Sequence, residues 1–155
     1  MKDFEIRLKK IQEKLNITTS KNVLISDEID ALKVTVPFDL PEWYIYFLKN
    51  TQIIGCSFDN LSSNKDEEFY DLEILDFIGI YDEIEIQDEE KLPLLFKKDM
   101  IPFANDNGGG DYYFLQLHED ITKTKVIQNF HDSLEENRLV CSNFMDFLEK
   151  LEIND

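Results

Sequence analysis

One short run of this sequence holds the residue types that acid–base catalysis or metal binding would use. His118-Glu119-Asp120 combines an imidazole with two carboxylates, groups that transfer protons or bind metal ions in many enzymes. Three adjacent residues do not easily converge on one ion, and a polar loop after a strand explains the run better. We interpret His131 and Asp132 similarly, as the end of a strand and its turn. The sequence therefore favours a protein with neither a catalytic nor a metal site here.

A second candidate is the glycine-rich segment Asn105–Asp111, which offers side-chain oxygens from Asp106, Asn107 and Asp111. These residues lack the regular ligand spacing of an EF-hand loop. The segment also lacks the Gly-Lys-Ser/Thr of a phosphate-binding loop, and its carboxylates would repel phosphate. Turn residues that bond their own backbone are favoured, with a positive φ at one or more of residues 108–110. We therefore expect a tight reversal and no cofactor.

The two cysteines, Cys56 and Cys141, indicate neither a disulfide framework nor a metal cluster, because they are too few and too far apart. Cys141 has no evident activating base nearby in the sequence, which disfavours a nucleophile. We expect both to be free, half-buried thiols.

Acidic charge is the strongest signal in the composition. The net charge is −17, and residues 59–90 contribute −12 of it, with thirteen acidic residues and one basic residue. Such a field repels phosphate backbones, so direct nucleic-acid binding is disfavoured. Two interpretations stay open: the acidic surface confers solubility, or it steers a basic partner.

If the segment binds a partner, we expect a continuous exposed patch within it that speeds association in a salt-sensitive way. Affinity would then come from buried anchor residues beside the charges, and Tyr70 and Tyr81 are the aromatic candidates. The candidate partner-binding residues are Tyr70, Tyr81, Asp82, Glu83, Glu85, Asp88, Glu89 and Glu90.

The size and hydropathy of the chain fit one domain. At 155 residues with 43% hydrophobic content, residues 1–155 are expected to form a single domain with one core. No stretch approaches the roughly 20 apolar residues of a membrane span. The N-terminus lacks the apolar run of a secretory signal, so we expect a cytoplasmic protein that does not contact a membrane.

Two helices are predicted in the first third of the chain. Phe4, Leu8, Ile11 and Leu15 recur at helical spacing, which predicts an amphipathic helix ending near Asn16. Residues 39–50 predict a second helix, because proline at position 41 suits a first helical turn. Its inward residues would be Leu40, Tyr44, Phe47 and Leu48, and Trp43 is interpreted as core rather than as a binding anchor.

Strands are predicted where apolar and β-branched residues form short runs or alternate with polar ones. Residues 17–38 are expected to form a loop with at most one short strand, and residues 78–87 fit a strand or a helix equally. Residues 92–96 suggest a helical turn, and 101–104 lead into the glycine-rich segment. The predicted strands are 53–58, 69–77, 112–117, 125–130 and 139–141.

A final helix is predicted after Ser142, which is a natural N-cap. Phe144, Phe147, Leu148 and Leu151 follow at helical spacing. Together these elements predict an α+β domain. Its mainly antiparallel sheet of about four to six strands would pack against the N- and C-terminal helices.

Three segments in this order resemble the SMI1/KNR4 pattern of the SUKH superfamily. The first runs from Leu40-Pro41-Glu42-Trp43 to Leu48. The second runs from Ile101-Pro102-Phe103-Ala104 through Gly109-Gly110-Asp111 to Leu117, and the third runs from Val126-Ile127 to Ser142–Leu148. The resemblance covers roughly residues 39–151 and implies an SMI1/KNR4-like fold.

The resemblance also implies a binding function. Many bacterial members of that family are immunity proteins that neutralise a toxin, often a nuclease, and fungal members are regulatory proteins without a known active site. We therefore expect a non-enzymatic binding protein without a cofactor, whose partner is a basic toxin domain. A regulatory or scaffolding module without a toxin partner is the alternative, and a small metal-dependent enzyme is a third, weaker one.

Overall fold

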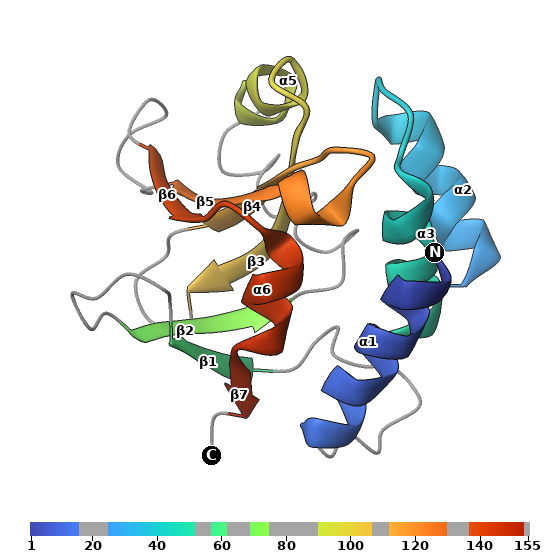
Figure 1. Ribbon diagram of the computed structural model, residues 1–155. Coiled ribbons are helices and arrows are strands. Elements are labelled where there is room, and N and C mark those ends of the chain that lie inside the picture. Colours follow the sequence, from blue (N-terminus) through green and yellow to red (C-terminus); the bar gives the residue numbers. More distant parts are fainter. Residues whose placement is uncertain are drawn as a thin grey trace.

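The computed structural model describes residues 1–15, 25–51, 57–61, 69–74, 90–106, 112–129 and 137–153. Within these residues the chain forms one antiparallel sheet with helices packed beside it (Figure 1). The predicted α+β class, with a mainly antiparallel sheet and helices towards both ends of the chain, is confirmed.

The sheet has seven strands in the order β6-β5-β4-β3-β2-β1-β7, and every neighbouring pair is antiparallel. β1 to β6 follow one another as a meander, and β7 returns to pair with β1. The sheet therefore has one strand more than the upper end of the predicted range. The strands are β1 (Ser57–Leu61), β2 (Phe69–Ile74), β3 (Met100–Asp106), β4 (Tyr112–Gln116), β5 (Lys125–Asn129), β6 (Asn137–Cys141) and β7 (Leu151–Ile153).

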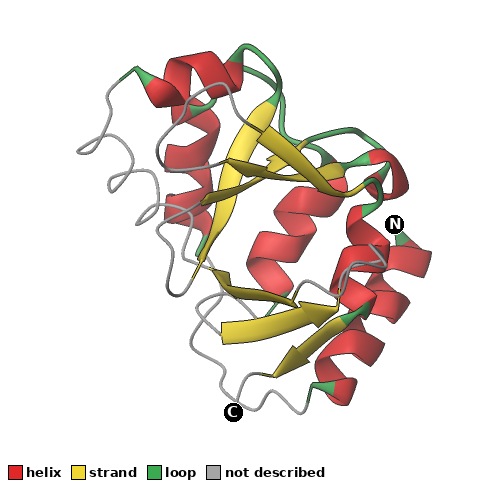
Figure 2. Ribbon diagram, turned by 90° about the vertical axis from the view of Figure 1, so that its left-hand side faces the viewer, coloured by secondary structure: helices red, strands yellow, loops and turns green. Residues whose placement is uncertain are grey.

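The three N-terminal helices lie together beside the sheet, and α6 lies between them and the strands (Figure 1). Figure 2 shows the same packing after a quarter turn. Since helices and strands each present an apolar side to the other, the core forms between the two layers. The helices are α1 (Lys2–Lys14), α2 (Ser26–Thr35), α3 (Glu42–Asn50), α5 (Lys91–Phe96) and α6 (Phe144–Glu149), with a 3₁₀ turn, η1 (Ile121–Lys123).

Phe144 lies at the centre of this core. Its side chain is fully buried, and its ring lies within 6.0 Å, centroid to centroid, of four other aromatic rings, from α3, β3 and α6 itself. Such pairs stabilise a core beyond the area they bury, because their edges and faces carry opposite partial charge. Phe144 therefore links the helices α3 and α6 to strand β3 of the sheet. Its four ring partners are Trp43, Phe47, Phe103 and Phe147.

The apolar pattern of the first and third helices is confirmed. Phe4, Leu8, Ile11 and Leu15 are all buried, and α1 ends at Lys14, close to the predicted end. In α3, Tyr44 is buried, and this burial raises the pKa of its phenol well above the ordinary value. Trp43 is also buried, which agrees with its interpretation as a core residue.

The prediction of a loop with at most one short strand for residues 17–38 is wrong over its second half, where α2 forms. Ile29, Leu32 and Val36 are buried at helical spacing. The carboxylate of Glu28 accepts a hydrogen bond from the backbone N–H of Ile25 at 3.2 Å, which satisfies a donor at the start of the helix. The β-branched residues 34–36 concealed this pattern, because their intrinsic preference is for strands.

β3 was also missed in the sequence, since proline is uncommon inside a strand. The structure accommodates Pro102 beside an irregularity in the β3–β4 register, between residues 102 and 104. β2 pairs only with residues 104–106 of β3, so Pro102 lies beyond that pairing. Asn105 and Asp106 consequently belong to the strand, whereas residues 107–111 of the predicted reversal lie outside the described residues.

The remaining strand and turn predictions agree to different extents. β4, β5 and β6 overlap the predicted strands closely, and α5 matches the predicted turn at 92–96. β1 overlaps the strand predicted at 53–58 only at residues 57–58, and β2 ends at Ile74. Residues 52–56, 75–89 and 130–136, which include the ambiguous 78–87 as well as Cys56, His131 and Asp132, lie outside the described residues.

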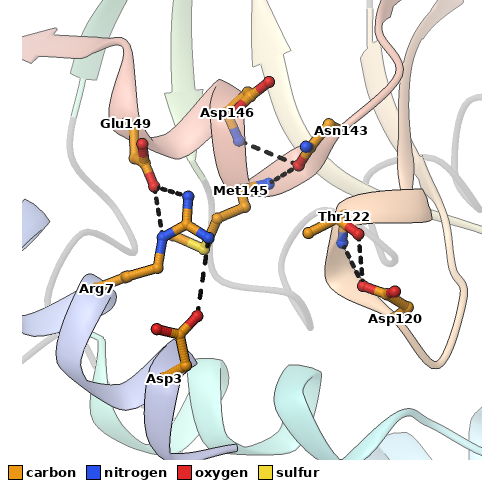
Figure 3. A network of polar contacts seen from close by, with 8 residues as sticks. All are labelled: Asp3, Arg7, Asp120, Thr122, Asn143, Met145, Asp146 and Glu149. Atoms are coloured by element: carbon orange, nitrogen blue, oxygen red, sulfur yellow. Dashed lines mark hydrogen bonds and ion pairs between the residues drawn. The ribbon is translucent and has the colours of Figure 1, made fainter.

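The C-terminal helix differs from the prediction at both ends. Asn143, not Ser142, is the N-cap of α6: its side-chain oxygen accepts hydrogen bonds from the backbone N–H groups of Met145 and Asp146, at 2.9 and 3.2 Å (Figure 3). Leu151 is buried but belongs to β7. The helical spacing of residues 144–151 therefore extended the prediction two residues too far.

Replacing Asn143 with alanine is expected to lower the free energy of unfolding by about 1 kcal/mol, because two helix N–H groups lose their acceptor. The measurement is urea unfolding followed by circular dichroism. Ser142→Ala is the matched control, and it should unfold like the parent protein, since Ser142 is exposed and is not the N-cap. Equal losses in the two variants would contradict the assignment of the cap.

Candidate functional site

The sequence-predicted partner-binding residues fall mostly outside the described part of the chain. Tyr70 belongs to β2, but the placement of its side chain is not described. Glu90 is exposed at the start of α5. The continuous acidic patch therefore stays a prediction. The predicted residues outside the described ranges are Tyr81, Asp82, Glu83, Glu85, Asp88 and Glu89.

A cleft of about 460 Å³ lies where three connections of the fold meet. One wall is the segment that joins α2 to α3, with the first residue of α3. The second is the loop after β4, and the third is the residue that precedes β3. We call this the 39–119 cleft. It is lined by Phe38, Asp39, Leu40, Pro41, Glu42, Asp99, Leu117, His118 and Glu119.

The walls of the 39–119 cleft are held together by hydrogen bonds between distant parts of the chain. The indole N–H of Trp43 donates to the backbone oxygen of His118 at 2.9 Å, which joins α3 to the loop after β4. The backbone N–H of Leu117 donates to the oxygen of Asp99 at 2.9 Å, which joins that loop to the start of β3. The shape of the cleft is thus set by the core and not by its exposed side chains.

Asp99 has an unusual backbone conformation, with φ at 57°. Aspartate tolerates the left-handed region better than most residues, although only glycine adopts it without steric cost. The turn that this conformation creates brings Asp99 from the end of α5 to the side of the cleft.

The cleft combines an apolar lining with an acidic one. Phe38, Leu40 and Leu117 are half-buried and pack against the core. Among the lining residues that the structure describes, none is a lysine or an arginine. Arg7, which forms ion pairs with Asp3 and Glu149, does not line this cleft. Four of the described lining residues are exposed carboxylates: Asp39, Glu42, Asp99 and Glu119.

The run His118-Glu119-Asp120 forms the loop between β4 and η1, as its polar character indicated. The ring Nδ1 of His118 accepts a hydrogen bond from the backbone N–H of Asp120 at 2.9 Å. The hydroxyl and backbone N–H of Thr122 both donate to the Asp120 carboxylate, and they lower its pKa (Figure 3). Asp120 thus stays ionised and begins η1.

A second hollow, of about 430 Å³, shares Glu42 and Glu119 with the first and extends towards α1. Its charge is partly balanced, because Arg7 also lines it. The Arg7 guanidinium forms ion pairs with Glu149 of α6 and with Asp3 of α1, and these connect the two helices (Figure 3). The 39–119 cleft is therefore the more strongly acidic of the two.

Within the described ranges, no three histidine, cysteine or acidic side chains are arranged to hold a metal ion. Cys141 is a half-buried free thiol whose Sγ donates to the backbone oxygen of Asn143 at 3.2 Å. The helices of the described residues are too short or too polar to cross a bilayer.

The carboxylates of the 39–119 cleft were missed in the sequence, because they come from three separate parts of the chain between residues 39 and 119. Leu40-Pro41 and His118-Glu119 were noted for other reasons, and nothing in their spacing places them together. Only the folded structure shows that the N-terminus of α3 lies beside the loop after β4.

The meander sheet, the returning β7 and the helices packed beside the sheet define an α+β protein. The family model described as SMI1 / KNR4 family (SUKH-1) matches residues 25–150. The chain belongs to this family, which confirms the resemblance seen in the sequence, and α1 precedes the matched residues. The family is generally one of binding proteins, so membership is consistent with a protein-binding role. A comparison with curated proteins gives no match.

Proposed function

We propose that this protein is an immunity protein that binds a basic toxin domain in the cytosol and neutralises it. It acts by covering the toxin's functional surface and needs no cofactor. Membership of the SMI1/KNR4 family supports a binding role, and the acidic character of the chain supports the choice of a basic partner.

The observation that carries this proposal is the concentration of negative charge. Residues 59–90 hold −12 of the total −17, and the 39–119 cleft adds four carboxylates with no lysine or arginine among its described lining residues. Charge that served solubility alone would not need to be concentrated. Nuclease toxins are basic where they hold phosphate, so an acidic surface can occupy the site of their substrate.

The proposal predicts that a neighbouring gene encodes a protein with a toxin domain, and it is tested with that domain in purified form. We expect the two purified proteins to form a complex with a Kd below about 1 μM, measured by calorimetry. The complex should abolish the toxin's activity in a purified assay, and co-expression should restore growth of cells that produce the toxin domain.

Two outcomes would contradict the proposal. Tight binding to a cellular protein that is not a toxin, together with no protection from the neighbouring toxin, would favour the regulatory or scaffolding alternative. A metal-dependent turnover by the purified protein itself would favour an enzyme.

A further inference from the structure

The 39–119 cleft has the properties of a site for one long cationic side chain. Its volume, about 460 Å³, is within the range of roughly 300–1,000 Å³ found for pockets that enclose ligands. The half-buried side chains of Phe38, Leu40 and Leu117 offer an apolar surface for an alkyl stem. The four carboxylates of the lining offer acceptors for a charged head group.

We propose that this cleft is the docking site for an arginine side chain of the protein partner. Arginine fits better than lysine, because its planar guanidinium can bond two carboxylate oxygens at once and can stack on an aromatic ring. Glu42 and Glu119 come from two different walls, and Phe38 supplies a ring in the lining. Arginine is also enriched among the residues that contribute most to interface affinity.

The walls are fixed before binding, which favours a specific anchor over a diffuse attraction. The Trp43–His118 and Leu117–Asp99 hydrogen bonds set the separation of the walls. A partner therefore spends little free energy on ordering this site. By contrast, carboxylates spread over a flat surface would attract any cation equally and would remain solvated.

This inference rests on the proposed function only for the partner's positive charge, and a peptide can test it without the partner. The probe is acetyl-Gly-Gly-Arg-Gly-Gly-amide, titrated into ¹⁵N-labelled protein at low salt. The matched control peptide carries citrulline, which has the shape of arginine without its charge. We expect saturable shifts of the Asp99, His118 and Glu119 amide signals with arginine, and an affinity at least about fivefold weaker with citrulline.

The matching protein variant is Glu42→Gln/Glu119→Gln, which keeps the size of both side chains. It should weaken arginine-peptide binding at least about fivefold. The control Glu13→Gln/Asp30→Asn removes the same charge from exposed positions outside the cleft, and it should change the affinity less than about twofold. If the first variant unfolds, as circular dichroism would reveal, Asp39→Asn/Asp99→Asn replaces it with the same expectation.

The inference fails if the arginine peptide causes no saturable shift at the cleft, if citrulline binds equally well, or if both variants weaken binding equally. Shifts confined to residues 82–90 would also refute it, while leaving the proposed function intact. Conversely, absence of binding between the parent protein and the toxin domain would refute the proposed function, and the peptide titration would still decide the role of the cleft.

Discussion

Replacing Phe144 with alanine is expected to lower the free energy of unfolding by about 3–5 kcal/mol. The side chain is fully buried, and its ring packs against Trp43, Phe47, Phe103 and Phe147. Its removal leaves a cavity between the helices and the sheet that these rigid rings fill only partly. Because small domains are stable by only about 5–15 kcal/mol, this variant should be close to unfolding at 37 °C. The measurement is urea unfolding followed by circular dichroism.

Val34→Ala is the control for this loss, since it also removes apolar atoms but from a residue that is 87% exposed. It should change the free energy of unfolding by less than about 0.5 kcal/mol. Phe144→Leu, which keeps most of the buried volume, should fall between the two. A Phe144→Ala variant as stable as the parent would show that the aromatic cluster is not the centre of the core.

Reversing the charge of two residues in the acidic segment, as in Glu83→Lys/Glu85→Lys, is expected to slow association with a basic toxin domain by about tenfold or more at low salt. The segment 59–90 carries a net charge of −12, and a concentrated field of one sign raises the encounter rate with the opposite sign. Raising the salt to physiological strength should reduce the difference, because the Debye length is then only about 8 Å. Stopped-flow measurements of the association rate at two salt concentrations test this.

The control is Glu13→Lys/Asp30→Lys, which changes the net charge equally at exposed residues outside the segment. If the effect depends on the local field, this variant should slow association much less. Dissociation should change little in either variant, because solvated rim charges contribute little to final affinity. An association rate that ignored both salt and charge reversal would show that the acidic segment serves solubility only.

The elements that were predicted correctly from the sequence are those whose apolar residues follow the pattern of one type of secondary structure only. α1 places an apolar residue at every helical turn, and residues 112–116 form a strand whose first four residues are apolar and all buried. Such patterns follow from local geometry alone, since a helix and a strand repeat every 3.6 and 2 residues.

The missed elements are those whose local preference opposes their tertiary role. α2 ends in β-branched residues and forms because Ile29 and Leu32 reach the core. β3 contains Pro102 and is supported by pairing with β4. β7 follows a helical pattern without a break, and only the edge of β1 makes it a strand. In each case the deciding contact is with a residue distant in sequence.

The candidate site was less predictable than the fold. The acidic excess of residues 59–90 is visible in composition, whereas the 39–119 cleft depends on three connections meeting in space. The charge of a segment follows from its composition. The shape of a cleft depends on the tertiary structure and cannot be obtained from composition.

The hydrogen bond from Trp43 to His118 gives the protein an intrinsic optical reporter. Trp43 is the only tryptophan in the chain, and its indole donates to a backbone oxygen in the wall of the cleft. Indole emission responds to the polarity and hydrogen bonding around the ring, so a side chain that entered the cleft and moved the His118 loop would change the fluorescence. Occupancy of this site can therefore be followed in the unlabelled protein, with tryptophan-selective excitation that excludes the six tyrosines.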